Sequence, residues 1–530
     1  MLARVQSSIL SGIDALPCEV EVDFDHAGSN KETIVGLPDA AVKESLERVR
    51  SALGNAGYPF PNGRIVINLA PADVRKEGPS YDLPIAVGLL VVQGIIPATN
   101  ATTARGRPPS QRSLSSQDSD SDSPGLDLRR FAFAGELALD GRLRPIPGGI
   151  ALASLAREKH MAGVIVPADN AAECAVVSGI DVLGARTITE VVGLLTGEIE
   201  PTPTPTPDIE SLLATATAPI DFVDVRGQES VKRALVVAAA GRHNILMLGP
   251  AGTGKTMMAK ALPGVLPPLE PDEAIEITRI YSAAGLLTSG QSLITARPVR
   301  TPHHTASSAA IVGGGMIPRP GEISLAHRGI LFLDELPEFP RDVLETLRQP
   351  LEDHVVTIAR AQATIKFPAS FMLVAAMNPT PKGDMPVGEF GQRAMDRYLS
   401  KISGPLLDRI DIHVEAPAVP WSQLRSAPTG TSSKQMREQA ARAWARQRAR
   451  QGVGIPNARL SGKQLDQFAN MDSGAQAFLG QAMTELGLSA RAYDKVRRVS
   501  RTIADLDNTD TITLAHVAEA VGYRLLDRKV

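Results

Sequence analysis

The stretch Gly249-Pro-Ala-Gly-Thr-Gly-Lys-Thr256 follows the apolar residues 245–248 and precedes residues 257–262, which favour a helix. This order of strand, glycine-rich turn and helix is the setting in which a phosphate-binding P-loop forms. The glycines let successive backbone N–H groups face a phosphate, and the helix that follows adds the positive end of its dipole. The stretch therefore predicts a nucleotide site in an α/β domain, with an ordinary glycine-rich turn as the alternative.

The expected roles within this loop follow from the chemistry of ATP and Mg²⁺. The Lys255 ammonium would contact the β- and γ-phosphates, and the Thr256 hydroxyl would hold Mg²⁺. The other residues would bind phosphate oxygens through their backbone. The predicted cofactor-binding loop consists of Gly249, Pro250, Ala251, Gly252, Thr253, Gly254, Lys255 and Thr256.

Two further apolar runs end in polar side chains that suit phosphoryl transfer. Residues 329–333 lead into Asp334 and Glu335, and residues 371–376 lead to Asn378. Buried parallel strands read as continuous apolar runs, and their C-terminal ends gather at one edge of the sheet. We expect Asp334 to bind Mg²⁺, Glu335 to activate water as a general base, and Asn378 to orient that water. A solvated acidic turn and a helix-capping asparagine are the alternatives.

Length and composition limit the class of protein. The chain has 530 residues, of which 43% are hydrophobic and 21% charged, as in a globular protein of several domains. The net charge of −3 does not indicate a polyanion partner, and two cysteines exclude a disulfide framework. The N-terminus lacks a signal-peptide pattern, and the longest apolar stretch, residues 83–96, is too short to cross a bilayer. We therefore expect a cytoplasmic protein that does not enter a membrane.

Two biased segments suggest how the domains are divided. Residues 97–127 are rich in Ser, Asp and Pro and predict a disordered insertion, while residues 201–208 alternate Pro with Thr and favour an extended spacer. The pattern upstream is mixed α and β, and the pattern near the C-terminus is helical. We expect an N-terminal domain at 1–200, a linker at 201–220, a parallel-sheet core at 221–420 and a helical lid at 421–530.

Longer motifs give the chain a family resemblance. Besides the P-loop, the acidic pair and Asn378, the chain carries Arg300-Thr-Pro-His-His-Thr-Ala-Ser307, Val312-Gly-Gly-Gly315, Pro318-Arg-Pro-Gly-Glu-Ile-Ser-Leu-Ala-His327 and Ser403-Gly-Pro-Leu-Leu-Asp-Arg-Ile-Asp411. Together these motifs resemble the magnesium chelatase-like branch of the AAA+ ATPases, specifically the bacterial YifB/ComM family. The resemblance covers almost the whole chain except the insertion.

The resemblance implies a ring, usually a hexamer, that binds ATP and Mg²⁺ between subunits. Arg409 of one subunit would reach the γ-phosphate held by the next, as an arginine finger does. The alternative for Arg409 is a structural ion pair with Asp408 or Asp411. Arg491 is similar to the family's second sensor on the helical lid, and which subunit's nucleotide it touches stays open.

Two segments are candidates for contact with DNA. Residues 353–360 and 363–367 alternate in polarity and predict a β-hairpin with Arg360 and Lys366 near its tip or flank. Related ring helicases grip phosphates with such hairpins, so the resemblance implies DNA, single-stranded or branched, as a partner and branch migration as the activity. The basic helix expected at 434–451 would line a DNA path. In both segments, a solvated charged surface is the alternative.

The N-terminal domain resembles the Lon protease fold but lacks its catalytic base. Ser80 stands where the Lon nucleophile sits, and the Lon lysine follows a glycine pair that corresponds to Gly148 and Gly149. Here Ala151 occupies the lysine position, so we expect a non-proteolytic Lon-like α+β domain. A Lon-like protease, a chelatase motor acting on a porphyrin and a non-enzymatic scaffold are the rival functions.

The adjacent His303 and His304 invite a metal hypothesis. Neighbouring side chains diverge from a regular backbone, and the sequence offers no third ligand. We therefore expect that these histidines do not bind a metal.

Overall fold

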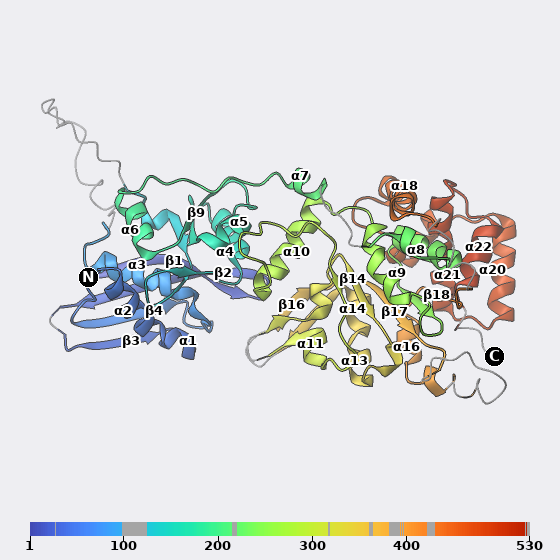
Figure 1. Ribbon diagram of the computed structural model, residues 1–530, viewed down its shortest axis with the longest axis horizontal. Helices are drawn as coiled ribbons and strands as arrows, with labels where there is room; N and C mark the ends of the chain where they lie inside the picture. Colours follow the sequence, from blue (N-terminus) through green and yellow to red (C-terminus); the bar gives the residue numbers. More distant parts are fainter. Residues whose placement is uncertain are drawn as a thin grey trace, which may run out of the picture. The chain divides into compact units, whose positions relative to one another are not determined.

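The computed structural model describes residues 1–530 apart from 27, 98–124, 215–219, 316–317, 360–363, 381–392, 394, 396, 421–429, 525 and 527–530. Most of the predicted disordered insertion thus lies outside the described residues. The chain divides into two compact units (Figure 1). The first comprises Met1–Ile209 and Ile275–Ile294, and the second comprises Glu210–Ala274 and Thr295–Val530.

The first unit is built on a seven-stranded mixed sheet in the order β3-β4-β2-β1-β5-β8-β9. Buried and exposed residues alternate along β1, whereas every residue of β8 is buried. The strands are β1 (Leu2–Ser11), β2 (Asp14–Asp25), β3 (Lys31–Val35), β4 (Arg64–Ala70), β5 (Phe131–Phe133), β8 (Gly163–Pro167) and β9 (Asp181–Ala185), with a separate hairpin of β6 (Glu136–Leu137) and β7 (Leu143–Arg144). The helices are α1 (Ala40–Lys43), α2 (Ser45–Asn55), α3 (Asp82–Val92), α4 (Gly149–Glu158), α5 (Ala168–Cys174) and α6 (Ile188–Thr196).

The second unit contains a parallel sheet in the order β11-β14-β17-β10-β18. Its strands are β10 (Ile245–Leu248), β11 (Val299–Arg300), β14 (Ile330–Leu333), β17 (Met372–Met377) and β18 (Ile412–Glu415). The three predicted strands are confirmed as its centre, since β14, β17 and most of β10 are fully buried. The sequence analysis missed β11 and β18, because β11 has two residues and β18 carries the buried polar side chain of His413.

The region that follows the sheet is helical, as predicted. It contains α18 (Ser433–Gln451), α19 (Gly462–Phe468), α20 (Ser473–Glu485), α21 (Ala490–Leu506) and α22 (Leu514–Gly522). In Figure 1, α18 and α21 lie next to α8 (Glu229–Gly241), and α22 and α20 lie farther from it. On α18, the Trp444 indole donates to Ala239 O (3.3 Å) and the Gln447 amide donates to Ala240 O (2.8 Å), so the lid helices share one core with the sheet.

Shorter elements complete the second unit. They are α9 (Lys255–Ala261), α11 (Ser308–Val312), α12 (Glu322–Leu325), α13 (Arg341–Thr346), α14 (Arg348–Asp353) and α16 (Gly404–Leu407), with hairpins of β12 (Gly313–Gly314) with β13 (Arg319–Pro320) and of β15 (Val355–Ala359) with β16 (Thr364–Pro368). Helix α10 (Pro271–Ala284) is divided between the units after Ala274. Residues 201–208 have no regular structure, and α7 (Ile209–Ala214) follows them. None of the helices among the described residues is both long and apolar enough to span a membrane.

Candidate nucleotide site and arginine face

The glycine-rich loop joins β10 to α9 at the C-terminal edge of the parallel sheet. Its backbone takes the left-handed conformation at Gly252 (φ +80°) and Gly254 (φ +85°), which side chains with a Cβ rarely adopt. Helix α9 then begins at Lys255 with its first backbone N–H groups free of intrahelical partners. This is the strand, turn and helix order that the sequence predicts, and it can bind a phosphate.

The Lys255 ammonium lies inside this loop. It donates to Gly249 O (2.6 Å), Pro250 O (2.8 Å) and Asn378 Oδ1 (3.2 Å). Burial lowers the pKa of Lys255, while the carboxylates of Asp334 and Glu335 act in the opposite direction. The structure therefore brings together the loop lysine and the Asn378 side chain that follows β17.

The two side chains expected to hold Mg²⁺ touch each other. The Thr256 hydroxyl donates to Asp334 Oδ2 (2.7 Å), and the backbone N–H of Glu335 donates to Asp334 Oδ1 (3.0 Å). Mg²⁺ takes oxygen ligands at about 2.0–2.1 Å and keeps several waters, so a hydroxyl and a carboxylate in contact fit its requirements. ATP and Mg²⁺ thus suit the residues present at this edge.

Glu335 has a neighbour that the sequence analysis did not assign to the site. His304 Nδ1 lies 3.5 Å from Glu335 Oε2. The expectation that the histidine pair binds no metal stays a prediction. Within the part of the chain that the structure describes, no three His, Cys, Asp or Glu side chains form a metal-binding group.

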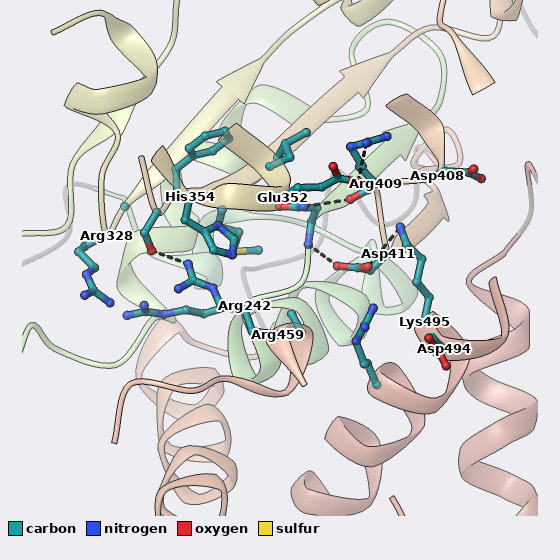
Figure 2. Close-up of a pocket in the computed structure, with 18 of the residues that line it drawn as sticks. Arg242, Arg328, Glu352, His354, Asp408, Arg409, Asp411, Arg459, Asp494 and Lys495 are labelled. Carbon is teal, nitrogen blue, oxygen red and sulfur yellow. Dashed lines mark hydrogen bonds and ion pairs between the residues drawn. The ribbon is translucent and has the colours of Figure 1, made fainter. Parts of the chain in front are cut away.

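A cavity of about 390 Å³ opens at the opposite edge of the same sheet (Figure 2). Its lining includes the residues that immediately precede four strands of the sheet: Asn244, Gly329, Phe371 and Asp411. Eight arginines and lysines and four acidic residues also line it, and Figure 2 shows several of them facing the cavity. The basic residues are Arg242, Arg297, Arg328, Arg409, Arg459, Arg491, Lys495 and Arg498, and the acidic ones are Glu352, Asp408, Asp411 and Asp494. We call this surface the arginine face.

The predicted arginine finger and second sensor both belong to the arginine face. Arg409 is 12% exposed, pairs with Glu352 (2.5 Å) and donates to Arg348 O (3.2 Å). Its in-chain partner is thus Glu352, and the two ion pairs considered from the sequence do not form. Arg491 is 67% exposed and lies 3.4 Å from Asp408.

Sheet register separates Arg409 from the P-loop of its own chain. Strands β10 and β18 are parallel neighbours, with Ile245 opposite Ile412 and Leu248 opposite Glu415. Arg409 precedes β18, whereas the loop follows β10. At about 3.3 Å per residue, the strands alone put about 10 Å between the two edges. Arg409 and Lys255 of one chain therefore lie at opposite ends of the sheet.

One carboxylate, that of Glu273, contacts three of the arginines that line the cavity. Glu273 accepts from Arg242 (2.7 Å) and Arg297 (2.8 Å) and lies 3.6 Å from Arg328. Burial alone would raise the pKa of Glu273, but these three guanidinium groups lower it to about 2. Arg242 also stacks on the Trp444 ring (4.6 Å).

Replacing Glu273 with glutamine should therefore destabilise the second unit. Because the pKa is depressed in the folded chain, the carboxylate stabilises it fully above the ordinary value of 4.5 and loses this effect as the pH falls toward about 2. We expect Glu273→Gln to cost about 3 kcal/mol at pH 7, since it leaves clustered guanidinium groups unpaired, and nothing additional near pH 2. Denaturant unfolding from pH 7 to pH 2 measures this difference. An equal loss at both ends of the range would contradict it.

The structure bears differently on the three candidate DNA contacts, which are Lys366, Arg360 and helix α18. Lys366 is exposed on β16 opposite Thr357 of β15, so the predicted hairpin is confirmed, while Arg360 lies outside the described residues. On α18, Arg448 pairs with Glu270 (2.9 Å) and Arg450 pairs with Asp505 (2.6 Å). Arg446 of the same helix pairs with Asp510. These ion pairs favour the alternative of a solvated structural helix for this segment.

In the first unit, the two residues that the sequence analysis compared with the Lon catalytic pair lie on different elements. Ser80 belongs to a 3₁₀ turn over Pro79–Tyr81, and its carbonyl accepts from Gly135 N (2.9 Å). Ala151 is buried in α4.

Comparison with protein families finds three matches that together cover most of the chain. Magnesium chelatase, subunit ChlI, matches residues 221–424, and the C-terminal family of the same subunit matches residues 430–524. A further ChlI family matches residues 20–107 and 118–170.

Individual relatives give a similar picture. Competence protein ComM of Haemophilus influenzae is 42% identical over 533 residues, which is 99% of this chain and 98% of that protein. YifB of Escherichia coli, an uncharacterised protein, is 41% identical over 531 residues, again 99% and 98% of the two chains. The magnesium-chelatase 38 kDa subunit of Rhodobacter capsulatus is 27% identical over 201 residues, or 34% of this chain and 55% of that subunit.

Proposed function

Because this chain belongs to the YifB/ComM family of magnesium chelatase ChlI-like proteins, we propose that it is a Mg²⁺-dependent ring ATPase that couples hydrolysis to movement on DNA. Membership of the ChlI family, a family of AAA+ ATPases, supports ATP hydrolysis. The observation that carries the proposal is the cluster at one sheet edge, where Lys255 contacts Asn378 and Thr256 contacts Asp334.

The chain's own residues would divide the chemistry among them. Lys255 would exchange its contacts with backbone carbonyls for the β- and γ-phosphates of ATP. Thr256 and Asp334 would hold Mg²⁺, which screens the phosphate charge when bound. Glu335 would take the proton of the attacking water, and Asn378 would orient that water toward the γ-phosphate.

The position of Arg409 supports a site shared between two copies of the chain. Its own nucleotide loop lies at the other end of the sheet, so its guanidinium would serve the ATP of an adjacent subunit. Arg491 lines the same cavity and is largely exposed, so we propose that it too faces the neighbour's nucleotide. Head-to-tail contacts form a ring when the rotation between copies closes, and the family resemblance suggests a closed ring of six subunits.

DNA is the partner we propose, with branch migration as the activity. A close relative is a competence protein, and the hairpin of β15 and β16 exposes Lys366. Phosphate contacts by such hairpins are electrostatic and tolerate any sequence. The first unit, which we propose to be Lon-like, would scaffold the ring or guide DNA without proteolysis, because Ala151 replaces the lysine base.

ATP turnover in the presence of DNA tests this proposal. We expect branched or single-stranded DNA to raise the turnover several-fold, and Lys366→Ala to reduce that stimulation. Lys463→Ala, which removes an exposed lysine from α19, is the matched control and should leave the stimulation intact. ATP hydrolysis that does not respond to either DNA would count against the proposed partner.

A chelatase-type motor is the second candidate, because the family matches are to a magnesium chelatase subunit. It would act on a partner protein that carries a porphyrin. Stimulation of ATP turnover by porphyrin and its carrier, with no response to DNA, would favour this candidate.

A further inference from the structure

The pairing of β11 with β14 brings the segment that carries His304 to the sheet edge where Glu335 lies. Strand β11 runs parallel to β14, with Val299 opposite Ile330 and Arg300 opposite Leu331. The chain that leaves β11 therefore emerges at the same edge as the residues that follow β14. This pairing places His304 Nδ1 3.5 Å from Glu335 Oε2, within ion-pair range.

The backbone of Glu335 is fixed in an unusual conformation. Its φ and ψ of +52° and +47° are left-handed, which is uncommon for a residue other than glycine. Its side chain is 48% exposed, so neither packing nor the backbone alone determines where the carboxylate points. A general base in water needs a group that holds it in position.

The two adjacent histidines have different surroundings. The His304 ring meets the edge of Phe339 with 6.4 Å between centroids, and it is 32% exposed. His303 instead directs its Nδ1 to Thr305, at 2.9 Å from the hydroxyl and 3.3 Å from the backbone N. The His303 ring also lies against the His304 ring, with 4.1 Å between centroids. Only His304 of the pair therefore contacts the proposed base.

We propose that His304 is a positioning residue for Glu335. Its Nδ1, 3.5 Å from Oε2, would hold that carboxylate oxygen and leave Oε1 to accept the proton of the attacking water. This inference rests on the proposed function, because it requires Glu335 to be the general base. Its role is separate from nucleotide binding, since none of its contacts among the described residues is with the P-loop.

Steady-state kinetics of His304 variants test the proposal. We expect His304→Ala to lower kcat for ATP by about ten- to a hundredfold through misplacement of the base, with KM for ATP unchanged. His304→Asn puts an amide N–H near the position of Nδ1 and should recover most of the loss. His304→Gln puts its amide near the position of Nε2 and should not. His303→Ala, the matched control, should retain the wild-type kcat.

A double-mutant cycle separates this inference from the function on which it rests. In a Glu335→Gln background, His304→Ala should cause no further loss of kcat, because the group it positions is already gone. An additive loss in that background, equal behaviour of the Asn and Gln variants, or a rise in KM at constant kcat would overturn the role of His304. Full activity of Glu335→Gln alone would instead refute Glu335 as the base.

Discussion

Replacing Lys255 with alanine is expected to remove ATP hydrolysis. The ammonium is the only cation among the described contacts of the P-loop and Asn378. Charge-assisted hydrogen bonds to phosphate contribute about 1.5–3 kcal/mol each, so affinity for ATP should fall at least about tenfold. The loss of kcat should be larger, about a thousandfold, because the charge on the γ-phosphate oxygens grows in the transition state. Fluorescent-nucleotide titration and phosphate release measure the two effects.

A second lysine of the same helix provides the control for this experiment. Lys260 is exposed on α9, one turn beyond the loop, and Lys260→Ala should retain both binding and turnover. The fold of Lys255→Ala should persist, because the partners that Lys255 leaves in its own chain are neutral oxygens. A Lys255→Ala variant that hydrolyses ATP at the wild-type rate would refute the nucleotide site.

Replacing Arg409 with alanine is expected to lower kcat by about 10³–10⁵, the range typical of arginine fingers. Binding of ATP should change much less than kcat, because an arginine finger acts mainly on the charge that develops on the γ-phosphate oxygens in the transition state. The matched control is Arg348→Ala. It removes a guanidinium that pairs with Glu345, from a residue whose backbone carbonyl accepts a hydrogen bond from Arg409. Light scattering should show that both variants assemble like the wild type.

The pairing of Arg409 with Glu352 adds a second expectation to this experiment. The in-chain ion pair must open before Arg409 can reach a neighbouring nucleotide. Glu352→Ala should therefore keep or raise ATP turnover. A loss comparable to that of Arg409→Ala would mean that the pair itself, and not a free guanidinium, is what the reaction needs.

Local patterns in the sequence predicted the three central strands of the parallel sheet and the contacts of Lys255 with Asn378 and of Thr256 with Asp334. Strands β14 and β17 are buried on both faces, so their sequences are continuously apolar and their ends can be located. The P-loop is a single contiguous motif. Its glycines indicate a left-handed backbone, which Gly252 and Gly254 adopt. Asn378 and Lys255, far apart in sequence, could be placed together because parallel strands end at one edge.

The arginine face and His304 could not be predicted in the same way. Arg242 follows α8, Arg297 precedes β11 and Arg459 lies in a 3₁₀ turn, so three segments far apart in sequence meet at the edge where the strands begin. The contact between His304 and Glu335 depends on β11, a two-residue strand that carries no apolar signal. In both cases, contacts between segments far apart in sequence decide the geometry. Local sequence propensities do not predict such contacts.

Mixing two inactive variants tests the central claim most directly. Arg409→Ala chains keep their own Glu335, and Glu335→Gln chains keep Arg409, so random rings of the two contain complete sites at about one interface in four. If the site is shared between copies, combining the variants under conditions that allow subunit exchange should restore a substantial part of the ATP turnover that each lacks alone. Turnover that stays at the level of the separate variants after exchange would contradict a nucleotide completed by the guanidinium of a neighbouring chain.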